Sequence, residues 1–195
     1  MRDDEVIELL VASGAIKRGH FLLSSGKHSD QYVEKFDLLR NPSLTSQILA
    51  GLASRLDADD IDVVVGPTTG GILLAFELGR LLERPTVYAE RVDDGSTRRE
   101  FRRGTSFQVG ARVLVIDDIL TTGGSIRETL EALASHPVAV VGVAVLVDRS
   151  GGAVRFGDLP IFPIASLTIE TWASSECPLC ADDVPLVKPG TTAVG

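Results

Sequence analysis

Two adjacent carboxylates and a turn of small polar residues lie close together at residues 113–125, which read VLVIDDILTTGGS. Asp117 and Asp118 follow an apolar run, and ionised carboxylates can accept hydrogen bonds from sugar hydroxyls. The turn at 121–125 has no bulky side chain, so its backbone N–H groups can approach a ligand closely. These residue types predict a site for a phosphorylated sugar, with the carboxylates on the hydroxyls and the turn on the phosphate.

The elements around this motif must hold it at one edge of a sheet. The apolar run predicts a strand buried on both faces, and residues 126–134 predict a helix whose free N–H groups face the same ligand. From residue 61 onward, strand-like and helix-like stretches alternate, which indicates an α/β fold with a mostly parallel central sheet flanked by helices. Ligands in such folds bind at the carboxyl ends of the strands, where the loops 66–71, 117–125 and 148–152 would converge.

The predicted helices and strands alternate only in the middle of the chain, so its two ends lie outside this pattern. We expect helices at 4–11, 41–55, 70–83 and 126–135, and strands at 61–65, 85–89, 112–116 and 138–147. We see no linker or repeat, so residues 1–195 are expected to form a single domain with a core at about 42–150. Residues of about 14–36 and 155–188 are expected to form a small cap over the sheet edge.

Four segments carry a resemblance to a known family. Residues 113–125 resemble the phosphoribosyl diphosphate (PRPP) motif of the type I phosphoribosyltransferases, and VVVGPTTGG at 63–71 resembles their diphosphate-binding loop. GHFLLSSGKHSDQYV at 19–33 and the Val147-Asp148-Arg149 triplet are similar to the substrate-binding segments of orotate phosphoribosyltransferases. Over residues 5–188 the chain resembles that family, which implies a type I phosphoribosyltransferase-like fold whose cap is a hood formed by the N-terminal segment and the C-terminal tail.

The resemblance implies transfer of the phosphoribosyl group from PRPP to orotate, giving orotidine 5′-monophosphate and diphosphate in pyrimidine biosynthesis. Asp117 and Asp118 would bind the ribose hydroxyls, and Mg²⁺ would be held mainly through PRPP with these carboxylates as indirect ligands. A cap at the end of a strand is the alternative role for such carboxylates. The implied PRPP-binding residues are Thr69, Gly70, Arg91, Asp117, Asp118, Ile119, Leu120, Thr121, Thr122, Gly123, Gly124 and Ser125.

The implied orotate-binding residues are Thr121, Arg149, Tyr32 and Val33. The planar guanidinium of Arg149 matches a carboxylate in a bidentate way, and the ring of Tyr32 could stack on a pyrimidine. Without the resemblance, Arg149 would read as a surface arginine at a strand end and Tyr32 as part of the core of the hood.

The polar stretch DDGSTRREFRRG at 93–104 predicts a mobile lid. The resemblance implies that this lid brings cations to the diphosphate in a neighbouring subunit, and therefore that the protein is a homodimer. Arg99 is taken as a catalytic candidate together with Asp117 and Asp118, while Arg98, Arg102 and Arg103 are further lid candidates. The stretch contains no lysine, although many family members have one there. A solvated charged hairpin is the alternative.

The charge and hydrophobicity of the chain argue against some classes of partner and location. The 195 residues are 44% hydrophobic and carry a formal net charge of −8, which argues against a nucleic-acid partner. The sequence shows no membrane-spanning run and no signal-peptide pattern, so a cytoplasmic protein is expected. Two other functions stay open: a phosphoribosyltransferase for another nucleobase, and a non-catalytic regulator that senses PRPP or nucleotides.

The two cysteines and two of the histidines are expected to have structural roles. Cys177 and Cys180 form one C-x-x-C pair, and the sequence has no second cysteine pair to complete a zinc site. A structural loop is therefore expected, with a disulfide or a metal shared between subunits as alternatives. His20 and His28 lack partners at a recognisable ligand spacing and are expected to form ordinary hydrogen bonds.

Overall fold

A six-stranded sheet forms the centre of the computed structural model, which describes residues 3–23 and 25–189. The strand order is β5-β4-β3-β6-β7-β8, and every neighbouring pair is parallel except β4 with β5. The predicted α/β fold with a mostly parallel sheet is thus confirmed. The strands are β3 (Val63–Pro67), β4 (Thr86–Arg91), β5 (Arg99–Glu100), β6 (Ala111–Leu120), β7 (Val138–Asp148) and β8 (Ile161–Ser166).

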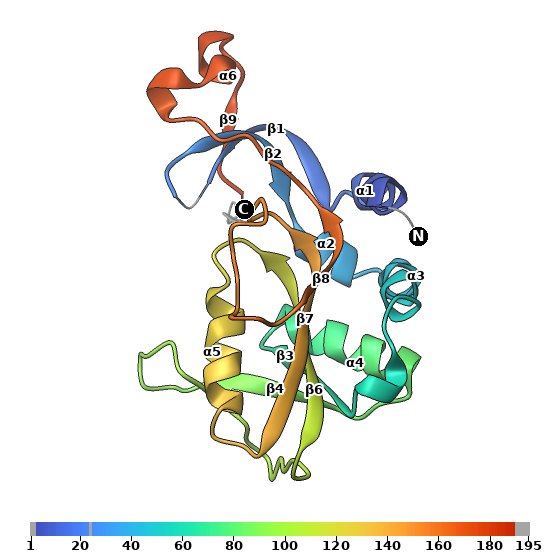
Figure 1. Cartoon of the computed structure of the whole chain (residues 1–195). Coiled ribbons are helices and arrows are strands. Elements are labelled where there is room, and N and C mark those ends of the chain that lie inside the picture. The colour runs from blue at the N-terminus through green and yellow to red at the C-terminus, as the bar shows by residue number, and fades with distance from the viewer. Residues whose placement is uncertain (1–2, 24, 190–195) are drawn as a thin grey trace.

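Helices cover both faces of this sheet (Figure 1). One face carries α3 (Pro42–Ala53) and α4 (Gly70–Leu82), and the other carries α5 (Gly124–Leu133). Strand β6 is buried between these helix layers. Its side chains reach both layers, because successive residues of a strand point to opposite faces. Leu114 and Ile116 pack into the cluster beneath α4, whereas Val113 and Val115 pack into the cluster beneath α5, and all four are fully buried.

The remaining helices are short or lie at the edge of the core. They are α1 (Asp3–Ala12), α2 (Lys35–Leu39), the 3₁₀ turns η1 (Ala58–Asp60) and η2 (Ser174–Glu176), and α6 (Pro178–Ala181). Asn41 caps α3 by accepting a hydrogen bond from the Leu44 N–H, and Pro42 occupies the first turn, as the sequence predicts. Among the described residues, no helix is long and apolar enough to cross a membrane.

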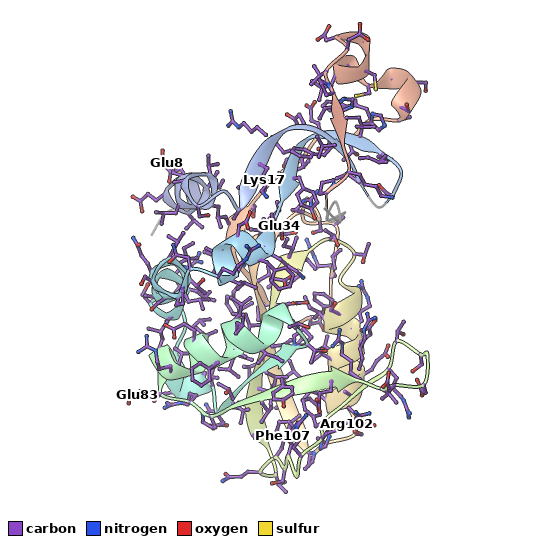
Figure 2. All side chains as sticks on the ribbon, turned by 180° about the vertical axis from the view of Figure 1, so that it is seen from behind. Glu8, Lys17, Glu34, Glu83, Arg102 and Phe107 are labelled. Carbon is purple, nitrogen blue, oxygen red and sulfur yellow. The ribbon has the colours of Figure 1, made fainter. Side chains whose placement is uncertain are left out.

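A second, three-stranded sheet forms a hood above the carboxyl ends of the core strands (Figure 1). In it β1 (Ile16–Leu22) pairs antiparallel with β2 (His28–Val33) and parallel with β9 (Leu186–Val187). Figure 2 shows Glu34, which follows β2, between the hood and the core. The hood therefore stands over the edge where the loops after β3, β6 and β7 converge.

One boundary of the predicted hood is wrong. Residues 161–166 were expected in the hood, but they form β8 and extend the core sheet beside β7. Ile164 and Ala165 of this strand are buried in the main core. The chain enters β8 from β7 through a loop without a helix, so the strand–helix alternation used to define the core stops one strand too early.

Candidate functional site

A cleft of about 490 Å³ lies between the hood and the carboxyl ends of the core strands. It brings together most of the residues expected to bind substrates, although they come from four separate segments of the chain. The lining includes Tyr32, Val33, Thr69, Gly70, Asp117, Asp118, Ile119, Thr121, Ser125 and Arg149. The predicted convergence of the three loops is confirmed by this arrangement.

Asp117 and Asp118 lie at the end of β6 and are both buried. Their carboxylates hold the local backbone: Asp117 Oδ1 accepts the N–H of Asp118, and Asp118 Oδ1 accepts the N–H of Ile119, each at 2.8 Å. Burial, together with the negative charge of Asp118, raises the pKa of Asp117 to about 7. One of the two acids therefore exchanges its proton near neutral pH.

Lys35 is a cation of the site that the sequence analysis did not identify. It begins α2, lines the cleft and places its Nζ 2.8 Å from Asp118 Oδ2. Its charge also lowers the pKa of Asp117, against the stronger effect of burial. The only signal in the sequence is its position two residues after Val33, which becomes informative once the hood is known to stand over β6.

The turn at 121–125 forms a second hollow of about 250 Å³ beside the cleft, lined also by Arg91 and Glu128. Gly123 has a φ of +77°, and a Cβ there would lie 2.6 Å from Arg127 Nη1 and 2.9 Å from the Phe156 ring. Only glycine fits this position, and it delivers the chain into the N-terminus of α5. Backbone N–H groups and the positive end of a helix dipole therefore face this hollow.

Two expected PRPP-binding residues differ in their surroundings. Arg91 lines the hollow and lies 3.7 Å from Glu128, with its side chain more than half exposed. Leu120, in contrast, points into the core cluster beneath α5, and its carbonyl accepts the N–H of Arg149. Because β6 continues through Leu120 and buries its side chain, only the backbone of this residue remains for a contact with PRPP, which stays a prediction.

The predicted diphosphate loop joins β3 to α4 at the rim of the cleft. Thr69 is exposed and Gly70 is the first residue of the helix. A Cβ on Gly70 would lie 2.2 Å from Asp118 Oδ2, and a Cβ on Gly66 would lie 2.0 Å from the carbonyl oxygen of Gly71. These glycines allow the helix to pack tightly on the strand and the carboxylate to lie against the loop.

Arg149 contributes an uncompensated positive charge to the cleft. No acidic side chain among residues 3–23 and 25–189 forms an ion pair with it, and its Nε is buried without a hydrogen-bond partner. Burial lowers the pKa of Arg149 from its ordinary value, partly offset by Tyr32. A half-buried guanidinium without an acid partner favours an anionic ligand, above all one that offers a planar carboxylate.

The predicted lid is divided between an exposed tip and an anchored strand. Residues 93–98 are exposed, but Arg99 lies in β5, where its side chain is 2% exposed and its Nε is 2.9 Å from Glu128 Oε2. Its Nη1 also donates to Thr68 Oγ1 and to the Ala89 carbonyl. The placement of Arg99 in a mobile lid is therefore wrong: Glu128, on the first turns of α5, holds it in the core.

The other lid arginines are on the surface. Arg98 pairs with Asp94 at 3.3 Å, Arg103 pairs with Glu90 at 3.4 Å, and Arg102 pairs with Glu100. Figure 2 shows Arg102 near Phe107, at the end of the molecule opposite the hood. Within the predicted lid, residues 93–98 and 102–104 are therefore exposed, on either side of the anchored Arg99.

Comparison with known proteins identifies the family. Residues 37–162 match the model of the phosphoribosyl transferase domain. The orotate phosphoribosyltransferase of Caldicellulosiruptor bescii is 43% identical over 191 residues, covering 98% of each chain, and that of Caldicellulosiruptor saccharolyticus is 41% identical over the full length of both. The chain belongs to the orotate phosphoribosyltransferase family. The crystal structure of the family member from Aeropyrum pernix is 32% identical, superposes with a TM-score of 0.67, and covers 83% of this chain and 93% of its own.

The family assignment agrees with the resemblance drawn from the sequence, but it does not account for a group of side chains in the hood. His20, His28, Cys177 and Cys180 place their ligating atoms within 4.8 Å of one another. The expected hydrogen bonds of the histidines are confirmed, since His20 contacts the Val184 carbonyl and His28. The structure adds that both cysteines, which the sequence left without further ligand partners, lie beside these two rings. The two halves of this cluster are about 150 residues apart in the chain, and no local spacing reveals it.

Proposed function

We propose that this protein transfers the 5-phosphoribosyl group from PRPP to orotate, releasing diphosphate and forming orotidine 5′-monophosphate in pyrimidine biosynthesis. The observation that carries the assignment is Arg149, whose guanidinium lines the cleft without an acid partner among the described residues. Orotate differs from uracil and from purine bases in offering a ring carboxylate, which pairs with such a guanidinium through two parallel hydrogen bonds.

The N-termini of α4 and α5 fit the diphosphate and the 5′-phosphate of PRPP. The turn at 121–125 and the N-terminus of α5 would hold the 5′-phosphate, and Thr69, Gly70 and the N-terminus of α4 would hold the diphosphate. Asp117 and Asp118 lie between these two helix ends and would accept hydrogen bonds from the ribose hydroxyls. Thr121 and Arg149 line the same cleft at the side that faces Tyr32.

The reaction requires positioning and charge stabilisation more than covalent catalysis. The bond from the ribose carbon to the diphosphate oxygen breaks, and the electron pair leaves with the diphosphate. The ring nitrogen of orotate forms the new bond, and its proton passes to the released diphosphate. Positive charge develops on the ribose, close to the carboxylates of Asp117 and Asp118. Lys35, next to Asp118, places positive charge at the same edge of the cleft, where negative charge on PRPP must be balanced.

The donor set of the cleft fits Mg²⁺. This ion is usually bound by one or two carboxylates together with substrate phosphates, and two carboxylates line the cleft. Asp118 already has Lys35 as a counter-ion, whereas burial and Asp118 disfavour the charge of Asp117, so Asp117 gains most from a nearby cation. When bound, Mg²⁺ would neutralise part of the charge of the diphosphate, and we propose that it is held mainly through PRPP.

We propose further that the protein acts in the cytoplasm as a homodimer whose lids are shared between subunits. Within the segment predicted as a lid, the exposed residues 93–98, which carry Arg98, support movement of the tip. Arg99 would act by anchoring this tip through Glu128 rather than by moving with it. A net charge of −8 supports small-molecule substrates over nucleic acid.

Steady-state kinetics of Arg149→Ala test the assignment. Loss of a bidentate, charge-assisted contact is expected to raise the KM for orotate by roughly 10- to 100-fold, with a much smaller effect on the KM for PRPP. Arg155→Ala is the matched control, because Arg155 is exposed and donates only to the carbonyls of Gly152 and Val154. An unchanged KM for orotate in Arg149→Ala would contradict the proposed carboxylate site.

A further inference from the structure

The hood contains a cluster of four ligating side chains that the proposed reaction does not use. His20 lies on β1, His28 on β2, Cys177 just before α6, and Cys180 within it. His20, His28 and Cys177 are each at most 4% exposed, and both cysteines are free thiols. The yellow sulfur atoms in Figure 2 lie at the outer end of the hood, away from the cleft.

The N···S distances within the cluster are close to the edges of a metal-centred tetrahedron, whereas the N···N distance is shorter, and all four ligating atoms lie within 4.8 Å of one another. His20 Nε2 lies 2.9 Å from His28 Nδ1 and 3.4 Å from Cys177 Sγ. Cys180 Sγ lies 3.3 Å from His28 Nδ1 and 3.7 Å from His20 Nε2. Typical Zn–N and Zn–S bond lengths give tetrahedral edges of about 3.4 Å for N···N and about 3.6 Å for N···S. The four atoms thus surround a space of the size that one such ion occupies.

The protonation of His20 also favours a metal. Its Nδ1 lies 2.8 Å from the carbonyl oxygen of Val184, which can only accept a hydrogen bond, so Nδ1 carries the proton. Nε2 of the neutral ring therefore directs its lone pair at the cluster. A hydrogen bond from one ring nitrogen to a backbone carbonyl is the usual means by which proteins orient a metal-binding histidine.

We propose that His20, His28, Cys177 and Cys180 bind one Zn²⁺ ion in a tetrahedral site that fastens the C-terminal arm, residues 171–188, to the hood. Two thiolates and two imidazoles form a closed donor set that is typical of structural zinc. Soft sulfur ligands combined with imidazole select against Mg²⁺ and Ca²⁺, which require oxygen. This site is separate from the Mg²⁺ proposed for the cleft.

The packing of the arm shows why it needs such a fastening. Across residues 171–188, Cys177 is the single buried residue, so apolar burial contributes little to holding this segment. Its strand contacts are short: Leu186 and Val187 pair with His20 and Phe21, and Trp172 forms a bridge with His28. The two histidines whose backbones pair with the arm are the same two that supply the ligands, so one ion ties the arm to both hood strands.

The position of the arm links this site to the cleft. Lys188 and Pro189, which follow β9, line a pocket of about 410 Å³ together with Tyr32, Thr121 and Arg149. Loss of the ion would release the segment that carries Lys188 from the side of the cleft assigned to orotate. Relative to zinc-loaded protein, metal-free protein is therefore expected to show a higher KM for orotate with a smaller change in kcat.

Metal analysis of the purified, untagged full-length protein tests the proposal. We expect one zinc per chain by inductively coupled plasma mass spectrometry. Metal-free wild type titrated with Co²⁺ should develop the visible bands of tetrahedral cobalt and a thiolate-to-cobalt charge-transfer band, which saturate at one equivalent. Zn²⁺ should then abolish these bands and raise the melting temperature.

Variants assign the ligands. Cys180→Ser and His28→Asn should lose stoichiometric zinc and the saturable cobalt spectrum, while His136→Asn should keep both. His136 is the matched control, because this third histidine packs against Phe101 and Phe107, far from the hood in the fold. The wild-type titration needs no variant, so a variant that fails to fold leaves the test intact. Wild type that takes up neither Zn²⁺ nor Co²⁺, that purifies with iron in the site, or that forms a Cys177–Cys180 disulfide in its folded form would overturn the proposal.

Discussion

Replacement of Asp117 by Asn tests whether the buried acid pair holds a proton near neutral pH. Burial and the adjacent Asp118 raise the pKa of Asp117 from 3.8 to about 7. Between these values the folded protein keeps a proton that the unfolded chain has released, so the stability this acid contributes is complete below about pH 4 and is lost as the pH rises through about 7. Asn is uncharged at every pH and can still accept the N–H of Asp118 through Oδ1.

The magnitude follows from linkage between protonation and folding. Each pH unit in the window changes the free energy of unfolding by at most about 1.4 kcal/mol, and the effect saturates near the folded-state pKa. Between pH 5 and pH 8, the wild type should therefore lose roughly 2 to 3 kcal/mol relative to Asp117→Asn. The stability of the variant should exceed that of the wild type most clearly at pH 8.

Urea unfolding followed by circular dichroism at pH 5, 6, 7 and 8 gives the comparison. Asp62→Asn is the control, because hydrogen bonds from Arg112 lower the pKa of Asp62 to about 2. The stability that this acid contributes is lost only as the pH falls toward 2, so Asp62→Asn should shift all four values equally. Parallel pH profiles for the wild type and Asp117→Asn would refute the reasoning, since they would mean that Asp117 is ionised throughout the range.

Two further predictions concern packing beneath the cleft. Gly66→Ala should lower the free energy of unfolding by about 2 kcal/mol or more, because the new Cβ would meet a backbone carbonyl of α4 at 2.0 Å. Gly124→Ala is the control, since no atom lies closer than 3.9 Å to its Cβ, and it should leave the free energy of unfolding nearly unchanged in the same urea titration. Glu128→Gln should destabilise the protein by about 3 kcal/mol, because it leaves the charge of Arg99 buried without its partner, and exposed Glu131→Gln on the same helix should not. Equal melting temperatures for the Glu128 and Glu131 variants would contradict this role.

The core of the fold was predictable from the sequence because its signals are local. The apolar run before Asp117 predicts β6, which proves to be buried on both faces. Asn41 and Pro42 mark the start of α3, and the glycine-rich turns after β3 and β6 lead into helices where expected. Since parallel strands present their carboxyl ends at one edge, the convergence of the three loops followed from the strand order.

The rest depended on contacts between distant segments. Arg99 lies in a polar, glycine-flanked stretch typical of a mobile loop, and only Glu128 on α5 explains its burial. Lys35 belongs to the site because it pairs with Asp118, which lies more than eighty residues later in the chain. Likewise, Cys177 and Cys180 are joined by two histidines only because the β1–β2 hairpin packs beside them, and this packing cannot be read from the sequence.

The base preference of the wild-type enzyme is the most direct test of the central claim. Transfer from PRPP in the presence of Mg²⁺ should be measured with orotate, uracil, adenine and hypoxanthine under the same conditions, by the absorbance change of each base. The unpaired guanidinium of Arg149 in the cleft predicts turnover of orotate alone. Turnover of uracil or a purine at a comparable rate would contradict the carboxylate site, and PRPP binding without turnover of any base would contradict the assignment of an enzyme.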